Sequence, residues 1–243
     1  MIIQCYDKSE RGKQLFKLLE KTDGITGHDR IIILPIPSTR DGVCISGTDI
    51  TLAELARDAM RGTLITGYGM PLWVKAEIKD RGATLVDCSE DEEFLLENAL
   101  LTSQAALGII LSESKRAPGD MKLGIVGYGR IGKDLARLLL FMGADICVFT
   151  SRAEVLAELG SMGVCVRRSE EDARLDDLDL IINTAPKRLF AISGEGESPP
   201  IMDLASGECY KDLPNSRQYP SLPAKCFPES AGNTWFRSIL RSL

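Results

Sequence analysis

The chain has 243 residues, of which 44% are hydrophobic and 26% are charged, a composition typical of a soluble globular protein with one large or two small domains. Its net charge of -6 and its pI of about 5.0 argue against a nucleic-acid-binding or membrane-surface role. The 7 cysteines are scattered without a C-x-x-C pair, and the 1 histidine is His28, so we expect reduced thiols, no metal site and no histidine-centred catalysis.

Strand and helix patterns alternate from the N-terminus onward. Met1 leads directly into a strand-like segment, without a signal peptide or a transmembrane run, so the expected location is the cytoplasm. The continuous apolar run at 30–35 is typical of a buried parallel strand, and Ser9 can cap the first helix. These patterns predict a small α/β domain with strands at 2–6, 30–35, 63–67 and 84–87 and helices at 9–21, 51–60 and 70–80.

Polar or glycine-rich segments follow two of these strands. Ser38, Thr39 and Arg40 come after the strand at 30–35, and Gly67-Tyr-Gly69 ends the strand at 63–67. Open α/β sheets bind ligands outside the carboxyl ends of their strands, so these segments are candidates for a site. The alternatives are that the serine and threonine are turn residues, that Tyr68 is packing and that Arg40 is a solvated charge.

A long apolar segment at 92–116 predicts a helix that links this domain to the next one. Asn98, Thr102, Ser103 and Gln104 interrupt its apolar character, and Ala117-Pro-Gly-Asp120 ends it. The polar residues face either water or a cleft between the two domains.

The segment 122–133 predicts a strand, a glycine-rich turn and the start of a helix that continues to Phe141. Gly127, Gly129 and Gly132 have the G-x-G-x-x-G spacing. The first glycine allows the tight turn, the second lets a pyrophosphate approach the backbone, and the third lets the helix pack on the sheet. The turn therefore predicts a dinucleotide site that also includes Tyr128, Arg130 and Ile131. The alternative is a glycine turn without a ligand.

The next predicted strand, at 145–150, ends without the carboxylate that usually binds the ribose of NAD. Thr150 and Ser151 can hydrogen-bond a 2′-phosphate, and Arg152 can pair with it. We therefore predict NADP(H) in preference to NAD(H). The alternative is that Thr150 and Ser151 cap the next helix and that Arg152 is solvated.

The remaining segments complete a second α/β domain. A helix is expected at 154–159 and strands at 163–166, 180–186 and 200–206, with Asn183 and Thr184 near a bound nicotinamide. A proline-rich loop is expected at 222–232, and an amphipathic helix at 234–243 whose aromatic face needs a partner in the first domain. The prediction is an α/β protein with two doubly wound parallel-sheet domains and a cleft between them. The domains are a flavodoxin-like one at 1–96 with 233–243, and a Rossmann one at 97–232.

This order of elements resembles the D-isomer 2-hydroxyacid dehydrogenase superfamily and, more closely, the dipicolinate synthase family of spore-forming bacteria, specifically its A subunits. The resemblance covers most of the chain. It rests on Ile33-Leu-Pro-Ile-Pro37 with Ser38-Thr39, Asn98 and Thr102, Gly127-x-Gly-Arg-Ile-Gly132, Asn183-Thr-Ala-Pro186, Asp203-Leu-Ala-Ser206 and Leu222-Pro-Ala-Lys-x-x-Pro-x-Ser-Ala-Gly232.

The chain departs from the family pattern in its N-terminal domain, which lacks about one strand–helix element. It also has Gly207-Glu-Cys-Tyr where the family usually has an arginine or a proline with glycines, and Gln104 and Ala224 where the family tends to have Glu and Gly. His28 precedes the expected catalytic region, so ordinary 2-hydroxyacid dehydrogenase chemistry is rejected. These departures affect the substrate site more than the cofactor site.

The resemblance implies an oxidoreductase that converts a dihydropyridine dicarboxylate to dipicolinate during sporulation, as a homodimer and with a flavoprotein-like second subunit. The implied catalytic candidates are Ser38, Thr39, Arg40, Asn98, Thr102 and Lys225. The implied cofactor residues beyond the glycine turn and Thr150–Arg152 are Asn183, Thr184, Ala185, Pro186 and Asp203. The alternative is a diverged, non-catalytic NADP-binding or regulatory subunit that acts with a partner chain.

Overall fold

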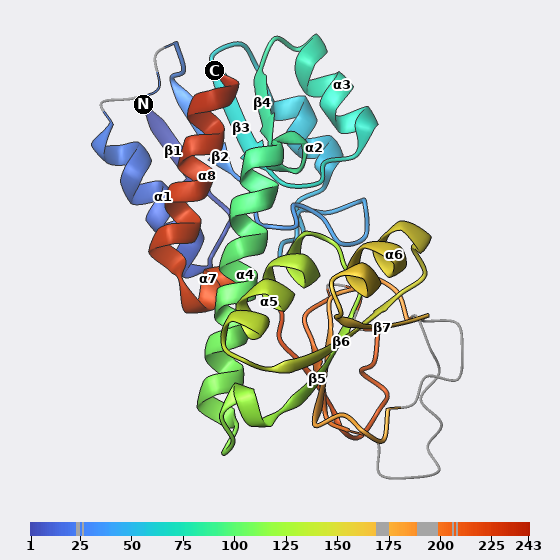
Figure 1. Ribbon diagram of the computed structural model, residues 1–243. Helices are drawn as coiled ribbons and strands as arrows, with labels where there is room; N and C mark the ends of the chain where they lie inside the picture. Colours follow the sequence, from blue (N-terminus) through green and yellow to red (C-terminus); the bar gives the residue numbers. More distant parts are fainter. Residues whose placement is uncertain (23–24, 26, 169–174, 189–198, 206, 208) are drawn as a thin grey trace. The chain divides into compact units, whose positions relative to one another are not determined.

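The computed structural model describes residues 1–22, 25, 27–168, 175–188, 199–205, 207 and 209–243 (Figure 1). Two compact units make up the chain: Met1–Asn98 with Pro223–Leu243, and Ala99–Leu222. The sequence placed the return to the first unit at 233. The structure places it ten residues earlier, because the expected loop at 222–232 is helical.

The first unit is a parallel sheet covered by helices on both faces, with strand order β1-β2-β3-β4. Ser9 accepts a hydrogen bond from the amide of Gly12 at 3.2 Å, so the predicted cap of the first helix is confirmed. The elements are β1 (Ile2–Cys5), α1 (Glu10–Lys21), β2 (Arg30–Ile33), α2 (Leu52–Asp58), β3 (Thr63–Gly67), α3 (Leu72–Asp80), β4 (Thr84–Asp87), the 3-10 turn η1 (Cys88–Glu90), α7 (Leu222–Cys226) and α8 (Pro228–Ser242).

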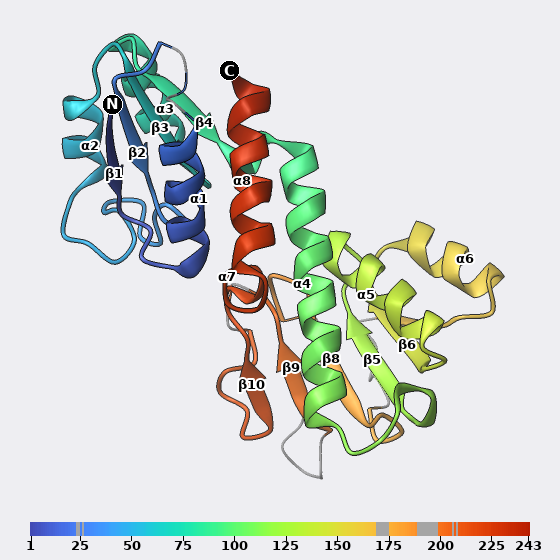
Figure 2. The same ribbon diagram turned by 90° about the vertical axis from the view of Figure 1, so that its left-hand side faces the viewer.

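The helices of this unit cover both faces of its sheet (Figure 2). Leu15 of α1 and Trp235 of α8 pack on the face that presents Ile31 and Ile33. The helices α2 and α3 pack on the face that presents Ile32 and Ile65. All steps β1→β2→β3→β4 move in the same direction across the sheet, so the connection through α1 has the opposite hand to those through α2 and α3.

Opposite hands are unusual, because about 98% of parallel crossovers are right-handed. The observed order equals the flavodoxin-like order 2-1-3-4-5 without its strand 2. With that strand present, α1 would connect to it rather than to β2, and every connection would have the same hand. The topology thus supports the expectation that this domain lacks an edge strand–helix element.

The C-terminal helix α8 packs on the first unit, as predicted. The indole nitrogen of Trp235 donates a buried hydrogen bond to the hydroxyl of Thr66 at 2.9 Å. A Cβ at Gly232 would lie 2.6 Å from Cγ of Gln14, so this glycine lets α8 approach α1 closely. The helix begins at Pro228, not at 234, because a proline in the first turn needs no N–H partner.

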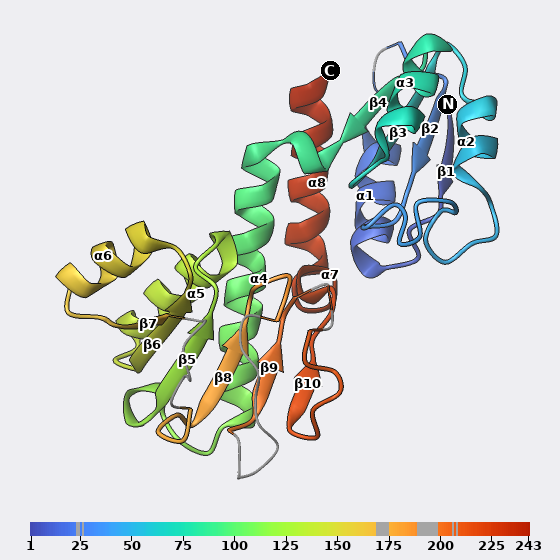
Figure 3. The ribbon, with the colours of Figure 1, turned by 90° about the vertical axis from the view of Figure 1, so that its right-hand side faces the viewer.

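The second unit has the strand order β10-β9-β8-β5-β6-β7, which read in reverse is the Rossmann order 3-2-1-4-5-6 (Figure 3). All of its strand pairs are parallel. The short edge strand β10 was not predicted, because its three residues are polar. The elements are η2 (Pro118–Asp120), β5 (Lys122–Val126), α5 (Arg130–Phe141), β6 (Asp145–Thr150), α6 (Ala153–Ser161), β7 (Cys165–Arg168), β8 (Leu180–Asn183), β9 (Ile201–Asp203) and β10 (Ser216–Gln218).

The linking helix is α4 (Glu92–Glu113), and the division between the units falls within it. By length and by its mean hydropathy of 1.5 it could cross a membrane, which is weak evidence by itself. Ala105, Ala106 and Ile110 are buried, and the hydroxyl of Ser103 donates to the carbonyl of Ile131 at 3.0 Å. These contacts are those of a core helix.

Candidate functional site

The glycine turn follows β5 and has the geometry expected of a dinucleotide-binding turn. Gly127 has φ +88°, a backbone conformation that residues other than glycine rarely adopt. A Cβ at Gly132 would lie 2.3 Å from the carbonyl oxygen of Gly127, so α5 packs too closely on the turn for any side chain. A Cβ at Gly129 would have no atom within 4 Å. The turn is therefore closed behind Gly127 and Gly132 and open at Gly129, where a pyrophosphate would approach.

The start of α5 offers backbone donors to an anion. Its N-cap is Gly129, which supplies no side-chain acceptor, and its first turn contains no acidic residue. The unpaired N–H groups of a first helical turn, together with the positive end of the helix dipole, favour a negatively charged ligand. Arg130 and Ile131 begin this helix, so the residues present fit a pyrophosphate.

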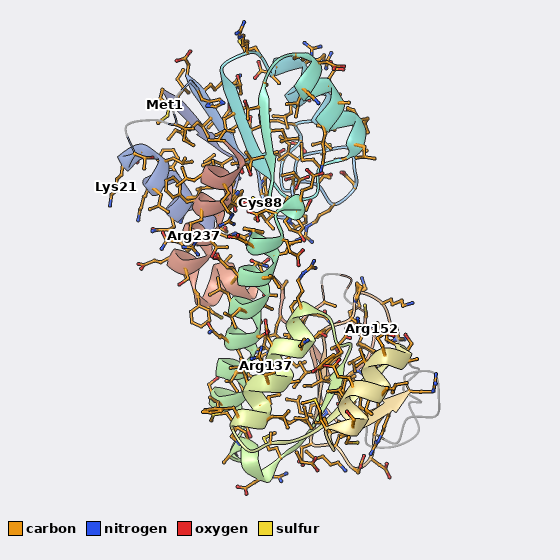
Figure 4. All side chains as sticks on the ribbon, turned by 45° about the horizontal axis from the view of Figure 1, so that its top comes forward. Met1, Lys21, Cys88, Arg137, Arg152 and Arg237 are labelled. Atoms are coloured by element: carbon orange, nitrogen blue, oxygen red, sulfur yellow. The ribbon has the colours of Figure 1, made fainter. Side chains whose placement is uncertain are left out.

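The end of β6 meets this turn through Arg152, the N-cap residue of α6 (Figure 4). The Arg152 guanidinium donates to the carbonyl oxygen of Tyr128, while its Nε lies 3.8 Å from the Glu154 carboxylate. The half-buried hydroxyl of Tyr128 has a raised pKa, chiefly because of burial and then because of the nearby Glu158. Arg152 is thus already held on the rim of the turn, with half of its side chain exposed.

Thr150 and Ser151 differ in what they can offer a ligand. Thr150 is 3% exposed, and its hydroxyl accepts the backbone N–H of Arg152 at 3.2 Å. Ser151 is exposed. The Thr150 hydroxyl therefore shapes the turn before α6, but neither it nor Ser151 caps this helix, whose N-cap Arg152 has no side-chain cap hydrogen bond. Ser151 and Arg152 remain candidates for binding a 2′-phosphate.

Asn183 and Asp203 end the neighbouring strands β8 and β9 and are both fully buried. The Asn183 amide donates to the Asp203 carboxylate at 2.8 Å, and the same carboxylate oxygen accepts the N–H of Ala205 at 3.0 Å. The other carboxylate oxygen of Asp203 accepts the N–H of Tyr210 at 3.3 Å. These two side chains therefore hold the loops after β8 and β9 through internal hydrogen bonds.

The segment after Asn183 lies beside the glycine turn. The Thr184 hydroxyl donates to the carbonyl of Val126 at 2.9 Å, and Ala185 is buried whereas Pro186 is exposed. Sequence analysis did not consider Arg188, which pairs with Asp212 at 2.6 Å and stacks on Tyr210. Ser206 and Glu208, which belong to the quoted motifs, lie outside the described residues.

In the first unit, the polar loops at the carboxyl ends of β2 and β3 bind each other. Ser38 is fully buried, and its hydroxyl accepts the N–H of Tyr68 at 2.7 Å. The Thr39 hydroxyl accepts the N–H of Gly42 at 2.9 Å and donates to Asp41 at 3.1 Å. Ser38 and Thr39 therefore both make hydrogen bonds within these loops, and the side chain of Ser38 is not accessible to solvent.

Asp87, at the end of β4, was not identified from the sequence. Its carboxylate accepts the N–H groups of Gly69 at 2.8 Å and Met70 at 2.9 Å and pairs with Lys75 at 2.6 Å. Burial acts to raise the pKa of this carboxyl, but the hydrogen bonds from Lys75 and Ser89 and from the backbone outweigh it and lower the pKa. The backbone N–H groups of Tyr68 and Gly69 are thus both bonded to side chains of this unit.

The other candidates differ in their exposure to solvent. Arg40 and Lys225 are exposed, the latter on α7. Asn98 and Thr102 are four residues apart on α4 and so share one face of the helix, where Asn98 is half-buried and Thr102 buried. His28 hydrogen-bonds Thr84 at 3.0 Å near the amino ends of the strands, far from their carboxyl edge.

Cavities, metal ligands and thiols were compared with the candidate site. A cavity of about 280 Å³, lined by Ile110, Met121, Leu180 and Met202 among others, lies at the amino ends of β5 and β8 and is distinct from the glycine turn. Within the described part of the chain, no group of three or more His, Cys, Asp or Glu side chains could hold a metal ion. All seven cysteines are free, and burial raises the pKa of the Cys88 thiol to about 12.

These observations define an α/β protein of the two-domain dehydrogenase type: two doubly wound parallel sheets, one with Rossmann order and a complete glycine turn. Solved structures share this fold. A D-lactate dehydrogenase from Treponema pallidum matches with a TM-score of 0.53 and 11% identity, covering 99% of this chain and 95% of that chain. No family model matches the sequence.

Among the similar proteins, the A subunit of dipicolinate synthase stands out, which confirms the resemblance drawn from the sequence. The chain is 24% identical over 220 residues to that protein from Bacillus subtilis (strain 168), covering 83% of this chain and 73% of the relative. The structure of the Bacillus halodurans protein matches with a TM-score of 0.74 and 18% identity over 98% of this chain and 96% of that chain. The structure of the Bacillus subtilis protein matches with a TM-score of 0.71 and 20% identity, covering 99% and 94%.

Proposed function

We propose that the chain is an NADP-dependent oxidoreductase that oxidises a dihydropyridine dicarboxylate to dipicolinate during sporulation. The observation that carries this proposal is the glycine turn, closed behind Gly127 and Gly132 and open at Gly129, with Arg152 on its rim. The dehydrogenase-type fold supports redox chemistry. The similarity to the A subunit of dipicolinate synthase supports the substrate class.

Bound NADP would take a hydride from the substrate, and the accompanying proton would pass to water or a weak base. Aromatisation supplies driving force, so the protein needs no strong base. Its task is binding and orientation. The first turn of α5 would hold the pyrophosphate, and Ser151 with Arg152 the 2′-phosphate. For the two carboxylates of the substrate, the exposed cations Arg40 and Lys225 remain our candidates. Asn98 and Thr102 would hydrogen-bond the ring or a water.

The cofactor part of the proposal is tested by titrating the purified chain with NADPH and with NADH while following nicotinamide fluorescence. Tight NADPH binding that Arg152→Ala weakens, while Arg217→Ala on the opposite edge strand does not, is the expected result. Equal affinity for NADH and NADPH would overturn the NADP assignment, and binding of neither would overturn the oxidoreductase proposal for the isolated chain.

The substrate part is tested by offering a dihydropyridine dicarboxylate together with NADP and following the reduced nicotinamide. Arg40→Ala and Lys225→Ala are expected to raise KM more than they lower kcat, because both residues would bind the substrate's charges. If KM and kcat are unchanged in both variants, neither residue binds the substrate.

A second candidate function is a diverged, non-catalytic NADP-binding or regulatory subunit. The observation that favours it is the closure of the first unit's polar loops, in which Ser38, Tyr68 and Gly69 bind internal partners. The proposed partners are a second copy of the chain and a flavoprotein-like second subunit. NADPH binding without turnover, restored or not by the second subunit, separates the two functions, and light scattering gives the oligomeric state.

A further inference from the structure

The strand β7 brings a second arginine to the end of β6. The two strands are parallel neighbours, with Cys147 opposite Cys165, Phe149 opposite Arg167 and Thr150 opposite Arg168. Paired residues of neighbouring parallel strands lie about 4.8 Å apart and point to the same face of the sheet. Arg168 therefore stands beside Thr150, on its face of the sheet.

The two consecutive arginines of β7 point to opposite faces and have different surroundings. Arg167 pairs with Asp177 at 2.8 Å and lies over the ring of Phe149 at 5.8 Å, on the face that also holds Cys147. Arg168 is exposed. Sequence analysis missed this position because it ended the strand at 166, two residues before the structure does.

Arg152 also lies beside Thr150, because it follows the end of β6 in the chain. Its backbone N–H is bonded to the Thr150 hydroxyl, and its guanidinium lies on the carbonyl of Tyr128. The Nε of Arg152 is 3.8 Å from the Glu154 carboxylate, which therefore compensates part of the positive charge of Arg152. One shared arginine is a weak counter-charge for a phosphate that carries about two negative charges at neutral pH.

We infer that Arg168 is a second specificity-determining residue and that Arg152 and Arg168 together clasp the 2′-phosphate of NADP over Thr150. This inference rests on the proposed function, because it requires a dinucleotide on the glycine turn. Arg168 contributes to discrimination between NADP and NAD and not to pyrophosphate binding, which belongs to α5. Because guanidinium groups pair with phosphate oxygens in a fixed fork, lysine at 168 is an incomplete substitute.

The test compares ligands that differ by the 2′-phosphate alone. Calorimetry measures adenosine 2′,5′-bisphosphate against AMP, and fluorescence measures NADPH against NADH, for wild type, Arg168→Ala, Arg168→Lys, Arg152→Ala and the double alanine variant. Arg217→Ala, an exposed arginine on the far edge of the same sheet, is the matched control.

Arg168→Ala is expected to weaken the bisphosphate and NADPH about tenfold, the size of a lost hydrogen bond to a charged group. AMP and NADH binding should stay within about twofold of wild type, which also shows that the site is folded. Arg168→Lys should fall between, and the double variant should bind NADPH and NADH alike.

Two results would overturn the inference. If wild type binds NADPH tightly and Arg168→Ala binds it equally well, Arg168 is not part of the site, although the proposed function stands. If Arg168→Ala weakens AMP as much as the bisphosphate, the residue supports the fold of the site and not the 2′-phosphate. Failure of the wild type to bind any of the four ligands overturns the proposed function together with this inference.

Discussion

The carboxyl edges of the two sheets differ in how their loops are satisfied. In the second unit the turn after β5 leaves Gly129 open and the first turn of α5 without a side-chain cap. In the first unit the loops after β2, β3 and β4 are joined by Ser38 and Asp87, whose side chains accept backbone N–H groups from the 67–70 segment. One edge has an open glycine turn, whereas at the other edge side chains bind the backbone N–H groups of the neighbouring loop.

This difference shows what a polar residue after a strand means. A glycine pattern specifies an open backbone, because the absence of side chains leaves donors and space. A serine or an aspartate at the same place can serve a ligand or its own loop, and the sequence does not distinguish these. Buried polar groups are hydrogen-bonded in folded proteins, so a full set of internal partners marks the second role.

The largest effect on stability is expected from Asp203→Ala, which breaks the internal network of the second unit. The substitution leaves the buried donors of Asn183 and Tyr210 and the half-buried N–H of Ala205 without their acceptor, at a cost of about 3 kcal/mol or more in free energy of unfolding. Hydrogen exchange resolved to the second unit measures it. Asp212→Ala, which removes an exposed carboxylate from the same segment, is the control and should cost less than about 0.5 kcal/mol.

If Asp203→Ala destabilises no more than Asp212→Ala, the carboxylate does not hold these loops. Asp203 would then again be a candidate for contact with the cofactor.

A smaller effect is expected from Gly132→Ala, which tests the closed side of the glycine turn. The added methyl would lie 2.3 Å from the carbonyl of Gly127, so the turn must shift, at a cost of about 2 kcal/mol. Gly160→Ala in α6 is the control, because a Cβ there meets nothing within 4 Å and alanine favours a helix. Thermal unfolding should show a lower midpoint for the first variant and an equal or higher midpoint for the second. If both variants unfolded at the same temperature, below that of wild type, the loss of stability would not come from close packing at Gly132.

The first unit should lose stability in acid through Asp87. The pKa of this carboxyl is lowered in the folded state, so its contribution is present above the unfolded pKa of about 4 and is lost as pH falls through the folded pKa. Asp87→Asn should reduce the stability of the first unit at neutral pH by about 2 kcal/mol and flatten its decline below about pH 4. Asp91 and Glu97, whose pKa values are also lowered, keep part of the decline. An unchanged acid profile in the variant would contradict the role of Asp87.

Sequence reasoning predicted much of the fold, because periodic apolar runs and glycine turns have local causes. The strands at 63–67, 84–87 and 145–150 were predicted with the bounds that the structure shows. Helix α8 was predicted to begin six residues late, because prolines were interpreted as loop residues although Pro228 occupies the first turn of the helix. The polar strand β10 has no local signal and forms by pairing with β9.

Only part of the candidate site could be predicted from the sequence. The glycine turn and Arg152 could be identified as candidates from the sequence. The first has a recognisable glycine spacing, and the second follows directly after a predicted strand. The hydrogen bonds of Asp87 and the proposed role of Arg168 were not anticipated, because both depend on which strands become neighbours, and only the folded sheet determines that. The burial of Ser38, Asn183 and Asp203 likewise results from tertiary packing.

The most direct test of the account is NADPH binding to Gly129→Val. A Cβ at this position would have no protein atom within 4 Å, so the variant should unfold at the same temperature as wild type. The valine would occupy the space of the pyrophosphate, so NADPH affinity should fall about a hundredfold or more, a loss of at least about 2.7 kcal/mol. An unchanged NADPH affinity in a normally folded Gly129→Val would contradict the claim that the open glycine turn of the second unit binds the dinucleotide.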